Sequence, residues 1–145
     1  MLTSPTTKEI TTALIEFHKE IGTISKDAAN PFFKSQYATL TKILETIKDP
    51  LTKNGLTFVQ FPDGDNGLTT RLMHSSGEWL EASYTMKPAK NDPQGLGSAI
   101  TYQRRYSIGA ILGLSTEVDD DGNAASIKGE SKPKQTVDDI AGDEF

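Results

Sequence analysis

The rest of this chain is arranged around residues 97–114, which read GSAITYQRRYSIGAILGL. Apolar and small side chains dominate this segment, Pro93 and Gly95 precede it, and Gly113 stands near its end. These helix breakers predict a helix from about Leu96 to Leu112. A helix of this length has to bury one face, so we expect a sheet to pack against it.

The two faces of the expected helix follow from a rotation of about 100° per residue. One broad apolar face holds Leu96, Ala99, Ile100, Tyr106, Ala110 and Ile111. The roughly opposite face holds Ser98, Thr101, Arg105 and Ile108. We therefore expect Arg105 to point away from the core and Arg104 to lie at the margin between the two faces.

Two adjacent arginines of this helix stand between two tyrosines, Tyr102 and Tyr106. The guanidinium groups of Arg104 and Arg105 can pair with phosphate through a planar fork, and aromatic rings stack on unpaired bases. The combination is typical of a site for single-stranded nucleic acid. An alternative stays open, in which the arginines are solvated helix residues and the tyrosines belong to the edge of the core.

Two runs of the sequence resemble the same family. The run GSAITYQRRYSIGAILGLSTEVDDDGN, at residues 97–123, resembles a signature of the ERF family of phage recombination proteins, which are single-strand annealing proteins. The run NPFFKSQYATL at residues 30–40, which continues through PLTKNGL at 50–56 into VQ at 59–60, is similar to the same family. Two long runs in the family's order are far more specific than one short pattern.

The family resemblance implies a set of properties that composition and spacing do not show. It implies ATP-independent binding of single-stranded DNA and annealing of complementary strands in phage homologous recombination. It also implies a β-β-β-α core and assembly into a homo-oligomeric ring or helical filament, in the cytoplasm of the bacterial host. We expect no nucleotide cofactor, because the glycines at 95, 97 and 113 match neither a dinucleotide fingerprint nor a P-loop.

The charge of the chain is unevenly distributed, although its net value is −5 over 145 residues. Residues 1–116 hold 12 basic and 11 acidic side chains, whereas residues 117–145 hold 3 basic and 9 acidic ones. We expect one annealing domain at 1–123 and a disordered acidic tail at 124–145. Any DNA contact then has to come from a local basic strip. Because the chain lacks cysteine, disulfides and thiolate metal sites are excluded.

The expected fold class is α+β. After a frayed start at residues 1–5, apolar spacing predicts one helix that ends at Gly22 and a second that Thr39 or Thr41 caps and Asn54 closes. Three alternating segments at 56–61, 68–74 and 78–87, joined by short turns, predict a three-stranded antiparallel β-meander. The long helix is expected to pack across this meander.

Cations and rings elsewhere in the chain complete the expected DNA-binding set. The polar connection at residues 23–38 places Lys34 between aromatic residues, and the loop after the last strand carries two lysines. The residues expected to contact DNA are Lys34, Tyr37, Arg71, Lys87, Lys90, Tyr102, Arg104, Arg105 and Tyr106.

The C-terminal residues 137–145, VDDIAGDEF, form an acidic run that ends in phenylalanine. This run is similar to the tail tip of bacterial single-strand-binding proteins, which recruits repair and recombination partners. The Phe145 ring and its carboxylate suit an apolar pocket rimmed by basic residues, with Asp138, Asp139 and Ile140 as further contacts. The alternative is a tail that only increases solubility.

Two other functions remain as alternatives. A metal-dependent nuclease would use Asp119, Asp120 and Asp121, but two-metal chemistry needs acids that converge from separate elements. The same acids fit an EF-hand loop poorly, because Ala124 stands where the loop needs glycine. The second alternative is an interaction protein that acts through its acidic tail. We expect a binding protein without catalytic residues and without a metal site.

Overall fold

The computed structural model describes residues 1–29 and 36–118. The chain belongs to the α+β class, with three helices and antiparallel sheets in the described part, and this confirms the predicted class. In chain order the elements are β1 (Leu2–Thr3), α1 (Lys8–Glu20), β2 (Ala28–Ala29), β3 (Gln36–Tyr37), α2 (Leu40–Lys53), β4 (Leu56–Asp63), β5 (Gly67–His74), β6 (Trp79–Thr85) and α3 (Pro93–Leu112).

The main sheet has four strands in the order β1-β6-β5-β4, and every neighbouring pair is antiparallel. The three predicted strands correspond to β4, β5 and β6, which pair in chain order. The expectation of a frayed N-terminus is wrong, because β1 adds a fourth strand. Ser4 holds the N-terminal segment at the sheet edge, because its amide donates to the Trp79 carbonyl and its hydroxyl accepts from the Trp79 amide at 2.9 Å. This exchange places Leu2 opposite Glu81.

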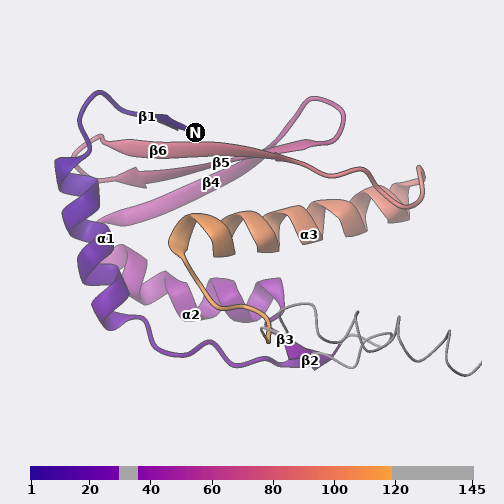
Figure 1. The fold of residues 1–145 in the computed structure, drawn as a ribbon, viewed down its shortest axis with the longest axis horizontal. Helices are drawn as coiled ribbons and strands as arrows, with labels where there is room; N and C mark the ends of the chain where they lie inside the picture. The colour runs from indigo at the N-terminus through magenta and orange to yellow at the C-terminus, as the bar shows by residue number, and fades with distance from the viewer. Residues whose placement is uncertain (30–35, 119–145) are drawn as a thin grey trace, which may run out of the picture.

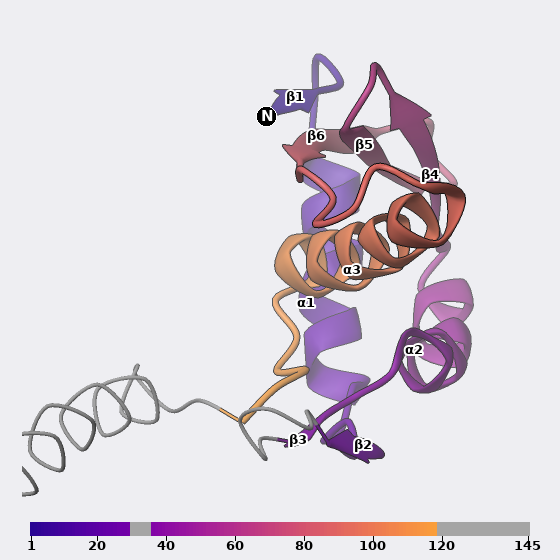
Figure 2. The ribbon, with the colours of Figure 1, turned by 90° about the vertical axis from the view of Figure 1, so that its right-hand side faces the viewer.

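All three helices lie on the same side of the main sheet (Figures 1 and 2). Helix α3 runs along the sheet, α2 lies beyond α3, and α1 crosses one end of the assembly. Apolar side chains of α1, α2, β5 and α3 meet where these elements converge, and they are the largest part of the core. Among the fully buried ones are Ile10, Phe17, Ile43, Ile47, Leu72, Ile108 and Leu112.

Side chains cap α2 and α3 at their N-termini. The Thr39 hydroxyl accepts from the amide of Lys42 at 3.2 Å, as the sequence predicted for α2. Helix α3 begins at Pro93, three residues earlier than expected, because the Asp92 carboxylate accepts from the amide of Gly95 at 2.6 Å. Proline suits this first helical position, since it has no amide hydrogen to satisfy.

Two features end α3 at its C-terminus, a backbone conformation and a contact with α1. Gly113 adopts a left-handed conformation with φ of 65°, which is the backbone geometry that glycine permits at a helix end. The Nε2 atom of His18 in α1 lies 2.8 Å from the carbonyl oxygen of Leu112. Helix α1 therefore fixes the position at which α3 ends.

The predicted faces of α3 are correct for Ala99, which is buried, but wrong at several other positions. Leu96 and Ile100, expected in the core, are exposed, whereas Gln103 and Arg105 are buried. Gln103 is only 3% exposed, and its Nε2 donates to the backbone carbonyl of Asn66 at 2.6 Å. The helix is covered on more than one side, so burial along it does not follow a single apolar stripe.

Residues 114–118 lead back from α3 to the connection between α1 and α2. The amide of Ala38 donates to the carbonyl of Thr116 at 2.7 Å, and Tyr37 forms an isolated antiparallel bridge with Glu117. Strands β2 and β3 pair in the same region, with Ala28 opposite Tyr37. The sequence predicted only a polar connection here, and the pairing instead gives Tyr37 a defined position beside α3.

Several predicted features fall outside the described residues. These are Lys34, the acids at 119–121 and the whole tail at 124–145. The predicted boundary between domain and tail therefore stays a prediction. Within the part of the chain that the structure describes, no helix is long and apolar enough to cross a membrane.

Candidate nucleic-acid interface

Arg105 is the centre of the candidate site. Its side chain lies on the buried side of α3 and the residue is 4% exposed. The guanidinium lies 4.4 Å from the ring centre of Tyr37, 4.8 Å from that of Tyr106 and 5.3 Å from that of Tyr102. Its Nη1 atom donates to Oε1 of Glu117 at 2.8 Å. We call these five residues the Arg105 cluster.

Three separate parts of the chain build this cluster. Helix α3 contributes Arg105, Tyr102 and Tyr106. The two tyrosines are four residues apart and therefore lie on the same side of the helix. Their rings stack with centroids 6.0 Å apart and planes inclined by 23°. Strand β3 supplies Tyr37, and its bridge to Glu117 brings the carboxylate to the guanidinium. The cluster therefore depends on the backbone pairing of β3 with the segment after α3.

The electrostatics of the cluster favour a neutral Tyr106 beside a compensated cation. Burial raises the pKa of Tyr106, and the negative charge of Glu117 raises it further, although Arg105 acts in the opposite direction. The Tyr106 hydroxyl therefore keeps its proton well above neutral pH. Glu117 in turn balances the charge of the buried Arg105.

The expectation that Arg105 points away from the core is wrong. Its guanidinium is enclosed by three rings and a carboxylate instead of facing solvent. Arg104 lies on another side of α3, beside β4, where its Nε atom is 3.4 Å from Oε1 of Gln60. The two adjacent arginines thus lie in different surroundings, and their contacts with DNA stay a prediction.

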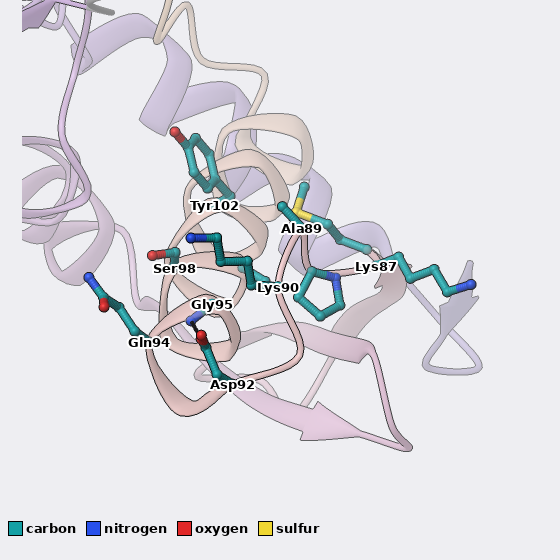
Figure 3. A pocket seen from close by; sticks show the side chains of 11 residues that line it. Lys87, Ala89, Lys90, Asp92, Gln94, Gly95, Ser98 and Tyr102 are labelled. Atoms are coloured by element: carbon teal, nitrogen blue, oxygen red, sulfur yellow. Dashed lines mark hydrogen bonds between the residues drawn. The ribbon is translucent and has the colours of Figure 1, made fainter.

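Two pockets open along the N-terminal half of α3 and share Ser98 and Tyr102 as lining residues. The first has a volume of about 440 Å³ and lies under the loop that joins β6 to α3; we call it the lysine pocket because Lys87 and Lys90 line it. In Figure 3, Lys90 extends across α3 on the side of Ser98, whereas Lys87 points away from the helix. Asp92 is the only acidic residue among those that line this pocket.

The second pocket, of about 370 Å³, is the tyrosine pocket. It lies between α3 and the start of α2, and Arg105 belongs to its lining. Its other lining residues are Tyr37, Thr39, Leu40, Gly97, Ser98, Thr101 and Tyr102. Tyr102, a residue that is 45% exposed, lines both pockets, which are therefore neighbours.

The structure thus places six of the predicted residues in the two pockets or in the Arg105 cluster: Tyr37, Lys87, Lys90, Tyr102, Arg105 and Tyr106. Arg71 is separate from them. It forms an ion pair with Glu81 at 2.8 Å and lies 4.1 Å above the ring of Trp79. Because the next residue, Leu72, packs in the core with the helices, Arg71 faces the other side of the sheet. Lys34 lies outside the described residues.

The sequence did not single out Glu117, Gly97, Ser98 and Thr101 as site residues. Glu117 precedes the acids at 119–121 in the sequence, and its position beside Arg105 depends on the backbone bridge to Tyr37, which local sequence does not reveal. The small size of Gly97 and Ser98 is the one local signal that could have indicated a pocket beside them. Among residues 1–29 and 36–118, no group of three His, Cys, Asp or Glu side chains could hold a metal ion.

The fold and the site define an α+β protein with an aromatic and basic groove along its last helix. The model of the ERF superfamily matches residues 10–140, which is most of the chain, so this protein belongs to the ERF superfamily. Membership associates it broadly with phage recombination and strand annealing. No curated protein and no solved structure matched the chain in the two other comparisons.

Proposed function

We propose that this protein binds single-stranded DNA and anneals complementary strands without ATP, in phage homologous recombination in the bacterial cytoplasm. The observation that carries the proposal is that two neighbouring pockets share Tyr102, one lined by lysines and the other by residues of the Arg105 cluster. Superfamily membership supports the same function.

Each group on this surface has a role in the proposal. The exposed Tyr102 ring stacks on an unpaired base, which is a contact that tolerates any sequence. Lys87 and Lys90 pair with phosphates as mobile point charges. Arg104 adds charge at the margin of α3, beside β4. This mode of binding moves no covalent bond, so we propose a binding protein and not an enzyme.

The proposal includes a homo-oligomer. Residues 1–116 are nearly neutral, so the affinity of one subunit for DNA is expected to be low. Subunits linked in a ring or a filament multiply weak contacts along one strand and hold it extended for pairing. We also propose that β4, β5, β6 and α3 correspond to the β-β-β-α core of annealing proteins. Asp138, Asp139, Ile140 and Phe145 remain proposed contacts for recombination partners.

The test compares binding and annealing in the same preparation. Fluorescence anisotropy with single-stranded and double-stranded oligonucleotides of equal length should show preference for the single strand, and labelled complementary strands should anneal without ATP. Tyr102→Ala should lower the affinity by roughly five- to a hundredfold, the value of one base–ring stack. Tyr84→Ala, which removes another exposed ring outside both pockets, is the control.

Two results would contradict the proposal. The first is the absence of any binding to oligonucleotides at low ionic strength, where phosphate contacts are strongest. The second is cleavage of labelled DNA in the presence of Mg²⁺, which would favour the nuclease alternative. Equal loss of binding in Tyr102→Ala and Tyr84→Ala would move the site away from the two pockets.

A further inference from the structure

We propose that the tyrosine pocket is a receptor for one unpaired nucleobase of the bound strand. This inference rests on the proposed function and assigns a different part of the bound nucleotide to each pocket. The base enters the tyrosine pocket, and its phosphate lies over the lysine pocket. The shared residues Ser98 and Tyr102 make the two pockets neighbours, as a base and its own phosphate require.

The walls of the tyrosine pocket suit a flat heterocycle. Tyr37 from β3 and Tyr102 from α3 line it from two different elements, and rings of this kind stack on any base. The Thr101 hydroxyl donates to the carbonyl of Gly97 at 3.1 Å, which leaves its oxygen able to accept from an amino group of a base. Ser98 adds a second hydroxyl at the border of the two pockets.

The charge of the pocket favours a base over a phosphate. Arg105 is the only basic residue among the lining residues, and its positive charge is compensated by the ion pair with Glu117. A phosphate needs positive charge, which the lysine pocket supplies through Lys90, whose side chain extends across α3 on the side of Ser98. Because its positive charge is compensated, the tyrosine pocket fits an uncharged ring with donor and acceptor groups at its edge.

The size of the pocket limits its occupant to one base. Its volume of about 370 Å³ lies at the low end of the range of roughly 300–1,000 Å³ that pockets for small ligands span. Gly97 forms part of the wall, and a Cβ atom built at this position meets no heavy atom within 4 Å. A larger side chain at residue 97 can therefore fill the pocket without disturbing the packing of α3.

The experiment uses Gly97→Leu in the full chain and two single-stranded probes of equal length and charge. One probe is oligothymidylate, and the other carries abasic sites in place of the bases. The wild-type protein should bind the base-bearing probe about tenfold more tightly, the lower part of the range for base stacking. Gly97→Leu should lose most of this preference and keep the wild-type affinity for the abasic probe.

The folding of the variant is monitored in parallel. Leucine has a higher helix propensity than glycine, so the melting temperature of Gly97→Leu should stay equal or rise while base preference falls. Gly22→Leu is the matched control, because a Cβ atom there also meets nothing within 4 Å and residue 22 lines neither pocket. This control should keep the preference for the base-bearing probe.

The outcomes separate this inference from the proposed function. Absence of binding of the wild-type protein to both probes would overturn the proposed function itself. Equal affinity of the wild-type protein for both probes would overturn the base receptor and leave DNA binding in place. A Gly97→Leu variant that retains the preference, or that loses affinity for both probes equally, would also overturn the base receptor.

Discussion

The Nη1 atom of Arg105 and the Oε1 atom of Glu117 lie 2.8 Å apart, and this ion pair joins the middle of α3 to the segment that follows the helix. The arginine side chain is 5% exposed and the glutamate side chain 43%. Because Glu117 also forms the backbone bridge to Tyr37, the pair fixes the ring that forms one wall of the tyrosine pocket. The stability of the fold and the shape of the site therefore depend on the same contact.

Removing the charge of Glu117 should destabilise the protein. Glu117→Gln leaves the buried guanidinium of Arg105 without its counter-charge, and we expect the free energy of unfolding to fall by about 1–2 kcal/mol. The loss is smaller than for a fully buried pair because solvent screens the partly exposed carboxylate. Urea unfolding measures it. Glu16→Gln, which breaks an exposed pair with Lys19, should change stability by less than about 0.5 kcal/mol, and equal losses in both variants would contradict the assigned role.

The lysine pocket predicts a change in the salt dependence of DNA binding. Lys90→Gln removes one phosphate contact, so the slope of log affinity against log salt should become shallower by about 0.7. Lys48→Gln removes an exposed lysine of α2 that lines neither pocket, and it should leave the slope unchanged. Titrations by fluorescence anisotropy at several salt concentrations provide the measurement. Identical slopes for Lys90→Gln and the wild-type protein would exclude Lys90 from the phosphate contacts.

Glu78 should make stability depend on pH in the acid range. Its carboxylate accepts from the amide of Ile10 and the hydroxyl of Thr6, both at 2.8 Å, at the N-terminus of α1. The bond from Ile10 is the largest cause that lowers the pKa of Glu78 below its ordinary value of 4.5, and the bond from Thr6 adds to it. Because the folded-state pKa is depressed, the stabilisation is present above pH 4.5 and is lost as pH falls through the folded-state value.

The measurement is urea unfolding of Glu78→Gln and the wild-type protein between pH 6 and pH 3. The difference in stability between the two should be largest at pH 6 and should shrink toward pH 3, as the wild-type carboxylate becomes protonated. Glu45→Gln, an exposed position on α2, should follow the wild-type profile at every pH. A difference that stays constant with pH would show that the Glu78 charge does not stabilise α1.

Two glycines of α3 should respond in opposite ways to alanine. A Cβ atom at Gly95 would overlap the backbone carbonyl of Lys90, so Gly95→Ala should displace the loop over the lysine pocket and lower stability by about 1–3 kcal/mol. Gly97→Ala meets open space and should raise stability by roughly 0.5–1 kcal/mol through helix propensity. Thermal unfolding measures both changes. An unchanged stability of Gly95→Ala would show that the loop can shift without losing stabilising contacts.

Local signals in the sequence predicted the helices well. Apolar residues at helical spacing indicated α1 and α2, and the Thr39 cap is confirmed, because periodicity and capping act over a few neighbouring residues. The same signals did not reveal the fourth strand, which depends on a contact between Ser4 and Trp79, 75 residues apart in the sequence. They also misplaced the buried side of α3.

The sequence by itself determined the superfamily, the α+β class and the residue types that can contact DNA. Tertiary structure alone decided that Arg105 is buried while Tyr102 stays exposed. It also decided that Glu117, and no other acid of the described chain, pairs with Arg105. The physical reason is that a side chain's surroundings depend on which distant segments pack against it. For α3 these are the main sheet, α2, Tyr37 of β3 and residues 114–118, and no periodic pattern within the helix encodes them.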